Sequence, residues 1–163
     1  MKKVFAMILV LCMLICDSAC AGYWADDVWI EDAWVLCQKG SLVNIREKPS
    51  KSSSVIPSLM ECGSEIHLDG KKKGSWLHCV NLSLEEDEGW IYEGYVTSRE
   101  PVLVEKEAYI KSNGRVAARK SVGGDRVKWL KPNQKVTVQY FSGDWCITNF
   151  GYVQGEYIEF VEE

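Results

Sequence analysis

The residues best suited to nucleophilic or metal chemistry are four cysteines and two histidines in the body of the chain. They are Cys37, Cys62, His67, His78, Cys79 and Cys146. A cysteine peptidase needs a thiolate beside a histidine. Both histidines fall on short strands of alternating pattern, which turns His78 away from Cys79 and turns His67 away from Ile66 and Leu68. We therefore expect no catalytic site.

A zinc site is the second chemistry that these residues could support. Cys62, His67, His78 and Cys79 give C-x4-H followed by H-C, which is not a usual spacing of zinc ligands. The strands of the two histidines should be antiparallel neighbours, so the rings could lie close together, but Cys79 should point to the other face. We expect no metal and no other cofactor, and we interpret both histidines as ordinary surface residues.

The first 21 residues have the order of an export signal. Lys2 and Lys3 precede an apolar run over residues 4–16, and residues 19–21 form an A-x-A cleavage site. The run is shorter than the about 20 residues that a membrane-spanning helix needs. We expect cleavage after residue 21, a secreted or periplasmic (cell-envelope) protein, and no stable membrane span. The alternative is a lipoprotein anchored through Cys20.

The charge balance argues against nucleic acid as a partner. The whole chain has 19 basic and 23 acidic residues, and removal of residues 1–21 takes away two lysines and one aspartate, so the net charge becomes −5. Four of the remaining acids (Asp26, Asp27, Glu31 and Asp32) lie in the aromatic segment 22–33. A polyanion would require a basic surface instead.

A disulfide is permitted in an exported chain, and small domains gain most from one. Cys37 takes the place of a small apolar residue in the first strand, and Cys79 occupies an inward-facing position. We expect a Cys37–Cys79 disulfide, with Cys62–Cys79 as the alternative. Reduced, buried thiols that act as small hydrophobic residues remain equally open, because spacing does not determine connectivity.

The rest of the chain predicts short strands and an internal repeat. Runs rich in Val, Ile, Trp and Tyr alternate with Gly, Ser, Asn and Pro, as in small all-β domains. Five blocks recur in the same order: 43–46 with 116–119, 55–59 with 126–130, 63–68 with 133–138, 74–76 with 143–145, and 89–96 with 151–158. A repeat of this length indicates one structural unit used twice.

Tryptophan and tyrosine carry the best binding signal, since exposed rings in a groove stack on sugars or peptides. The candidate ligand-binding residues are Trp29, Trp34, Trp90, Tyr92, Tyr95, Trp129, Tyr152 and Tyr157. Trp76 and Trp145 follow a turn in each copy, and we expect them to be structural.

The ordered blocks resemble the bacterial SH3 (SH3b-like) domain family. The first copy reads VNIREKPSKSSSVIPSL, GSEIHL, WLHCV and GWI, and the second reads VAARKSVGGDRVKWL, NQKVTV, WCIT and GYV. The family pattern opens on a Leu-Asn-Val-Arg-like strand and closes on Gly-Trp-Val. Val43 stands here for the Leu, and Ala117 for the Asn. The resemblance implies binding to cell-wall peptides, peptidoglycan or protein partners.

We therefore expect an all-β chain of two tandem, small SH3-like β-barrels behind an N-terminal signal helix. The expected units are a signal peptide (1–21), an acidic aromatic segment (22–33), a first barrel (34–99) and a second barrel (100–163), which meet near Pro101. The expected function is non-enzymatic recognition of cell-wall peptide or peptidoglycan. The alternative is an adaptor or inhibitor that binds an envelope protein through a composite surface of both barrels. A cysteine-dependent peptidase comes third.

Overall fold

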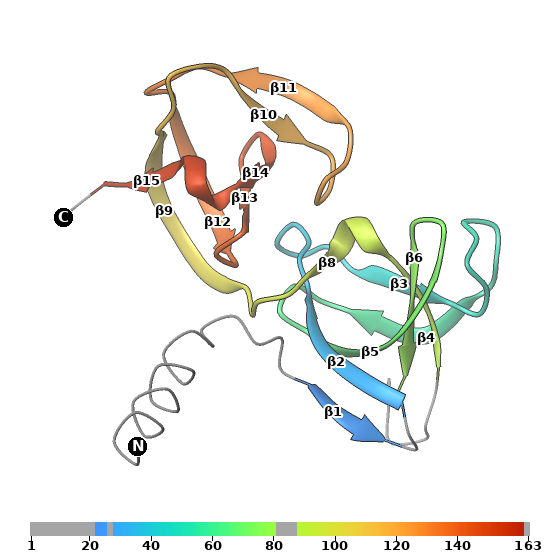
Figure 1. Cartoon of the computed structure of the whole chain (residues 1–163). Helices are drawn as coiled ribbons and strands as arrows, with labels where there is room; N and C mark the ends of the chain where they lie inside the picture. Colours follow the sequence, from blue (N-terminus) through green and yellow to red (C-terminus); the bar gives the residue numbers. More distant parts are fainter. Residues whose placement is uncertain (1–21, 26–27, 81–87, 162–163) are drawn as a thin grey trace, which may run out of the picture.

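The computed structural model describes residues 22–25, 28–80 and 88–161 (Figure 1). The expected signal helix with Cys20, the acids Asp26 and Asp27, and the loop 81–87 lie outside these residues. The described chain is all-β, as predicted, and its only helical elements are two short 3-10 turns. No helix in this part of the chain is long and apolar enough to cross a bilayer.

The first half of the chain forms one antiparallel sheet. Its strands are β1 (Gly22–Ala25), β2 (Val28–Val35), β3 (Val43–Arg46), β4 (Val55–Met60), β5 (Glu65–Lys73), β6 (Trp76–Val80), β7 (Gly89–Tyr92) and β8 (Val96–Thr97). The strand order is β1-β2-β5-β6-β7-β3-β4, and β8 also pairs with β2. A 3-10 turn, η1 (Glu93–Tyr95), joins β7 to β8.

The second half forms another antiparallel sheet. Its strands are β9 (Val102–Ile110), β10 (Val116–Arg119), β11 (Arg126–Leu130), β12 (Lys135–Phe141), β13 (Trp145–Thr148), β14 (Gly151–Gln154) and β15 (Ile158–Phe160). The order is β11-β10-β14-β13-β12-β9-β15, and the turn η2 (Gly155–Tyr157) joins β14 to β15.

The two sheets have the same topology. From β8 to β4 the first sheet reads β8-β2-β5-β6-β7-β3-β4, and the second reads β15-β9-β12-β13-β14-β10-β11, so every strand from β2 onward has a counterpart. In neither half does the strand pairing among the described residues close into a ring, because β4 pairs only with β3 and β11 only with β10. The structure therefore shows two open antiparallel sheets rather than the closed barrels that we expected.

The described residues of the acidic aromatic segment 22–33 lie in β1 and β2 of the first sheet. Residues of β1 pair with β2, and β2 pairs with β5 through Asp32 opposite His67 and Ala33 opposite Ile66. Ala33 is buried in the first core, so this strand is needed to close that core. The two sheets are joined by residues 98–101, between β8 and β9.

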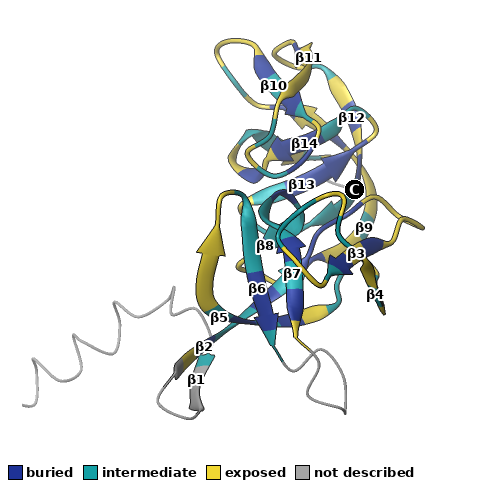
Figure 2. Ribbon diagram, turned by 90° about the vertical axis from the view of Figure 1, so that its right-hand side faces the viewer, coloured by how far each residue is buried: buried dark blue, intermediate teal, exposed yellow. Residues whose placement is uncertain are grey.

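Each half has its own apolar core, formed by the inward-facing residues of its strands (Figure 2). In β3, Val43 and Ile45 are buried whereas Asn44 is exposed, and β12 buries Val136 and Val138 in the same way. The apolar residues of these strands therefore share one face, which packs into the core, because successive side chains on a strand point to opposite faces.

The two halves pack against each other through a third, smaller cluster. Its buried members are Leu36, Ile147 and Tyr152, with Cys62, Val122, Tyr140 and Trp145 packed around them. The Tyr152 hydroxyl donates a hydrogen bond to the Leu36 carbonyl oxygen at 3.0 Å, in a buried position. This hydrogen bond joins β14 of the second half to the residue that follows β2 in the first half, and a main-chain bond from the Val122 nitrogen to the Gly94 carbonyl also connects the halves.

Candidate functional site

A groove of about 740 Å³ lies where the two halves meet. The first half lines it with the loop after β2, with β3 and the loop that follows it, and with one aromatic residue each from β6, β7 and η1. The second half lines it with the loop after β10 and with β14. Its aromatic, charged and polar lining residues include Asn44, Arg46, Lys51, Trp76, Tyr92, Tyr95, Lys120, Ser121, Asp125 and Tyr152.

One wall of the groove is aromatic. Trp76 of β6 lies directly opposite Tyr92 of β7 in the strand register, and their ring centroids are 5.9 Å apart in an edge-to-face arrangement. Tyr92 meets Tyr95 in the same way at 6.0 Å. Edge-to-face contacts hold such rings in defined orientations. Three rings of the first half are thus in contact along this wall, and the buried Tyr152 of the second half also lines the groove.

The charged side chains of the groove are mainly basic, with Arg46, Lys51 and Lys120 against Asp125. The Arg46 guanidinium donates a hydrogen bond to the Ser53 carbonyl at 2.6 Å and so holds its own loop. The exposed Lys51 ammonium lies 5.8 Å from the centroid of the Tyr92 ring. A groove of this kind suits a ligand that carries a carboxylate or another anionic group beside a flat apolar or sugar surface.

The loops that line the groove are built alike in both halves. Arg119 donates a hydrogen bond to the Gly124 carbonyl at 2.8 Å, which is the counterpart of the Arg46 bond to Ser53. In each copy the arginine at the end of the strand thus holds the following polar loop through a hydrogen bond to a main-chain carbonyl. The repeat therefore places two equivalent loops at the groove.

The predicted aromatic residues do not all meet. The structure brings Tyr92, Tyr95 and Tyr152 into the groove and adds Trp76, which we expected to be structural. The other five candidates lie elsewhere: Trp29 and Trp34 on β2, Trp90 on β7 against His78, Trp129 on β11 under the Arg126 guanidinium, and Tyr157 on η2.

The polar part of the groove was not predicted from the sequence. Arg46, Lys51, Ser121 and Asp125 lie in or beside the loops that follow the repeated strands, and the alignment of those loops in the repeat was the available signal. These residues meet in one groove only because of how the two halves pack, and the pattern of apolar residues along the strands does not indicate that packing.

His78 is buried, which corrects the expectation of a surface histidine. Its Nδ1 lies 2.9 Å from Asp69 Oδ2, and its ring lies 4.8 Å from that of Trp90. The neighbouring Cys79 side chain is in the apolar core of the first half. Although burial raises the pKa of Asp69, hydrogen bonds from Lys71 and His78 outweigh it and hold that pKa below its ordinary value. His78 and Asp69 therefore form a buried, hydrogen-bonded pair within the first half.

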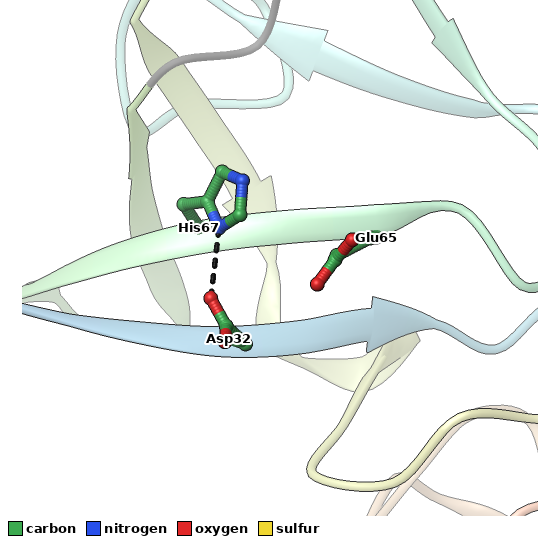
Figure 3. A group of neighbouring side chains, drawn as sticks. All are labelled: Asp32, Glu65 and His67. Carbon is green, nitrogen blue, oxygen red and sulfur yellow. Dashed lines mark hydrogen bonds and ion pairs between the residues drawn. The ribbon is translucent and has the colours of Figure 1, made fainter. Parts of the chain in front are cut away.

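His67 belongs to a second group on the same strand. Its Nδ1 lies 3.0 Å from Asp32 Oδ1, and Glu65 lies beside the pair (Figure 3). One ligand atom from each of the three residues lies within 4.8 Å of the others. The structure thus groups His67 with two carboxylates, whereas the sequence suggested Cys62, His78 and Cys79 as its candidate companions.

The four described cysteines are free thiols. The Cys37 thiol interacts with that of Cys62, which raises the pKa of Cys37 and lowers that of Cys62. Burial raises the pKa of Cys79 and of Cys146 to about 12. Neither the Cys37–Cys79 disulfide nor the alternative Cys62–Cys79 disulfide is formed, although Cys37 and Cys79 belong to the same core and Cys62 packs against it.

No protein-family model matches the chain, and no curated protein matches it. Among solved structures, NlpC1 and NlpC2 from Trichomonas vaginalis match with TM-scores of 0.34 and 0.33, each at 14% sequence identity. The matches cover 88% of this chain but only 49% and 50% of those proteins, so the chain spans about half their length. Similarity at this level assigns neither a fold family nor an activity.

Proposed function

We propose that this chain is an exported, non-enzymatic binding protein, and that two SH3-like modules hold a cell-wall peptide or peptidoglycan fragment in the groove between them. The observation that carries the proposal is the groove itself, which combines an aromatic wall with basic side chains from both halves. Its volume of about 740 Å³ falls within the range of sites for small ligands.

The chemistry of the groove fits this class of ligand. Rings such as Tyr92 and Tyr95 offer stacking faces for sugars and flat surfaces for peptide groups. Lys51 and Lys120 stand on opposite halves and supply positive charge for the carboxylates of an acidic wall peptide. The resemblance of both copies to bacterial SH3 domains supports the same class of ligand.

The test is retention of the purified protein on insoluble peptidoglycan, compared with a heat-denatured sample. The double variant K51A/K120A removes both lysines from the groove and should lower retention several-fold. K48A/K131A is its matched control, because Lys48 and Lys131 are also exposed, one in each half, but do not line the groove. Retention no higher than that of the denatured sample, or an equal loss in both double variants, would refute the proposal.

A protein partner is the second candidate, and a separate observation favours it. The end strands of the two sheets expose apolar side chains: Val55 and Leu59 on β4, and Val127 and Trp129 on β11. Exposed apolar strand edges are a common surface for protein binding. If an adaptor or inhibitor role is correct, L59D and V127D should abolish capture of an envelope protein whereas K51A/K120A should not.

A further inference from the structure

We propose that Asp32, Glu65 and His67 form a binding site for a divalent first-row transition metal ion, for which Zn²⁺ is the probe. None of these residues lines the groove between the halves. The proposal is therefore independent of the function argued above, and each can fail without the other.

The strand register places the three side chains on one face of the first sheet. Asp32 of β2 lies directly opposite His67 of β5, and Glu65 precedes His67 by two residues. Residues two apart on a strand point to the same face. Ala33 and Ile66, which lie between them in the register, point into the core and are buried. The main chain around the site is therefore fixed by the pairing of β2 with β5 and by the packing of Ala33 and Ile66 in the core.

The separations fit a single ion after a small adjustment. Zinc binds nitrogen and oxygen ligands at about 2.0–2.2 Å, so two ligands of one ion lie no more than about 4 Å apart. The Asp32 and His67 atoms are already 3.0 Å apart, and all three ligand atoms lie within 4.8 Å of one another. Glu65 is exposed, so a rotation of its side chain is enough to bring its carboxylate closer (Figure 3).

The donor set selects the class of ion. One imidazole nitrogen with two carboxylates suits zinc and its first-row neighbours, whereas Ca²⁺ and Mg²⁺ prefer oxygen ligands alone. Two carboxylates also balance the charge of a divalent ion. The His67 and Asp32 side chains retain partial exposure, at 26% and 18%, so the ion can enter and a water molecule can complete four-fold coordination.

The experiment is calorimetric titration of the untagged, chelator-treated protein with ZnCl₂, alongside visible spectroscopy with Co²⁺ as a stand-in ion. We expect one zinc per chain. H67Q, D32N and E65Q should each weaken binding at least about tenfold, the scale seen when even outer-shell partners of metal sites are lost. Circular dichroism of each variant will show whether it is folded.

Two control variants separate this site from other sources of zinc binding. C62S removes a thiol of the Cys37–Cys62 pair, and E61Q removes an exposed carboxylate of the same half. Both should bind zinc as the wild type does. Absence of zinc binding in the wild type, unchanged binding in H67Q, or loss of binding in C62S would each overturn the proposal.

Discussion

Replacement of Gly94 by alanine tests how closely the two halves are packed. Gly94 lies in η1, is buried, and accepts a hydrogen bond from the Val122 main-chain nitrogen at 2.9 Å. A Cβ at this position would lie 2.7 Å from Ser121 Oγ and 2.8 Å from Ser121 Cβ, and 2.6 Å from Tyr92 Cε1. The Ser121 hydroxyl can rotate away, but its Cβ cannot, so the loop after β10 must move.

The expected loss of stability follows from two opposing effects. Overpacking of this kind costs typically about 1–3 kcal/mol. The alanine also lowers the conformational entropy of the unfolded chain, which raises the free energy of unfolding by about 0.4–1 kcal/mol. We expect G94A to lower the free energy of unfolding by about 1–2 kcal/mol, which urea denaturation measures directly.

The control is G114A, because a Cβ on Gly114 meets no atom within 4 Å and the residue has no positive φ. This variant should be as stable as the wild type or slightly more so. The double variant G94A/S121G tells the two clashes apart, since it relieves the contact between the halves but keeps the one with Tyr92. Equal stability of G94A and G114A would refute the packing that we describe, whereas rescue by S121G would assign the loss to the contact between the halves.

Three further predictions concern hydroxyl and thiol groups. Y152F should lower the free energy of unfolding by about 1–3 kcal/mol, because it leaves a buried carbonyl of the first half without its donor; urea denaturation tests this. Burial raises the pKa of the Cys79 and Cys146 thiols from the ordinary value of about 9 to about 12, so these thiols lose their protons at lower pH in the unfolded chain than in the folded one. Stability should therefore be complete below pH 9 and fall between pH 9 and 12, and pH-dependent melting of C146A should show a shallower fall than the wild type. Oxidation should join Cys37 to Cys62 and raise stability by about 3.5 kcal/mol, as mass spectrometry of unreduced peptides and melting of C62S will show.

The internal repeat predicted more of the fold than any single motif. The recurring blocks correspond to β3 through β8 and to β10 through β15, in the same strand order. The alternation of apolar residues was enough to predict which faces of β3, β5 and β12 are buried, since side chains on a strand alternate between two faces. Closure of the sheets was not predictable, because it depends on pairing at the strand ends rather than on pattern.

Equivalent positions in the repeat have different surroundings, and sequence alone could not show this. Trp90 and Tyr152 occupy the same place in the two copies. Trp90 packs on the ring of His78, whereas Tyr152 reaches across to the main chain of Leu36 in the other half. The difference arises from what each copy packs against, which is a property of the assembled pair.

The same dependence explains why the candidate site was predicted only in part. Aromatic content favoured a binding groove and identified three of its rings, Tyr92, Tyr95 and Tyr152. Lys51 and Lys120 carried no signal of their own, because an exposed lysine in a polar loop is ordinary in any small domain. They become binding candidates only when the packing of the two halves sets them around one groove.

Packing of the halves and ligand binding should therefore be thermodynamically coupled. Domains as small as either half bury only about 60% of their unfolded surface and are marginal alone, so the contact through Leu36, Ile147 and Tyr152 stabilises both. A ligand that touches Lys51 and Lys120 together binds only when the two halves are packed against each other. Its binding therefore stabilises the packed state, and any change that destabilises the packed state weakens its binding. Loosening the contact at Gly94 should weaken retention on peptidoglycan even though no groove side chain is removed, whereas K51A/K120A should weaken retention and leave the packing intact.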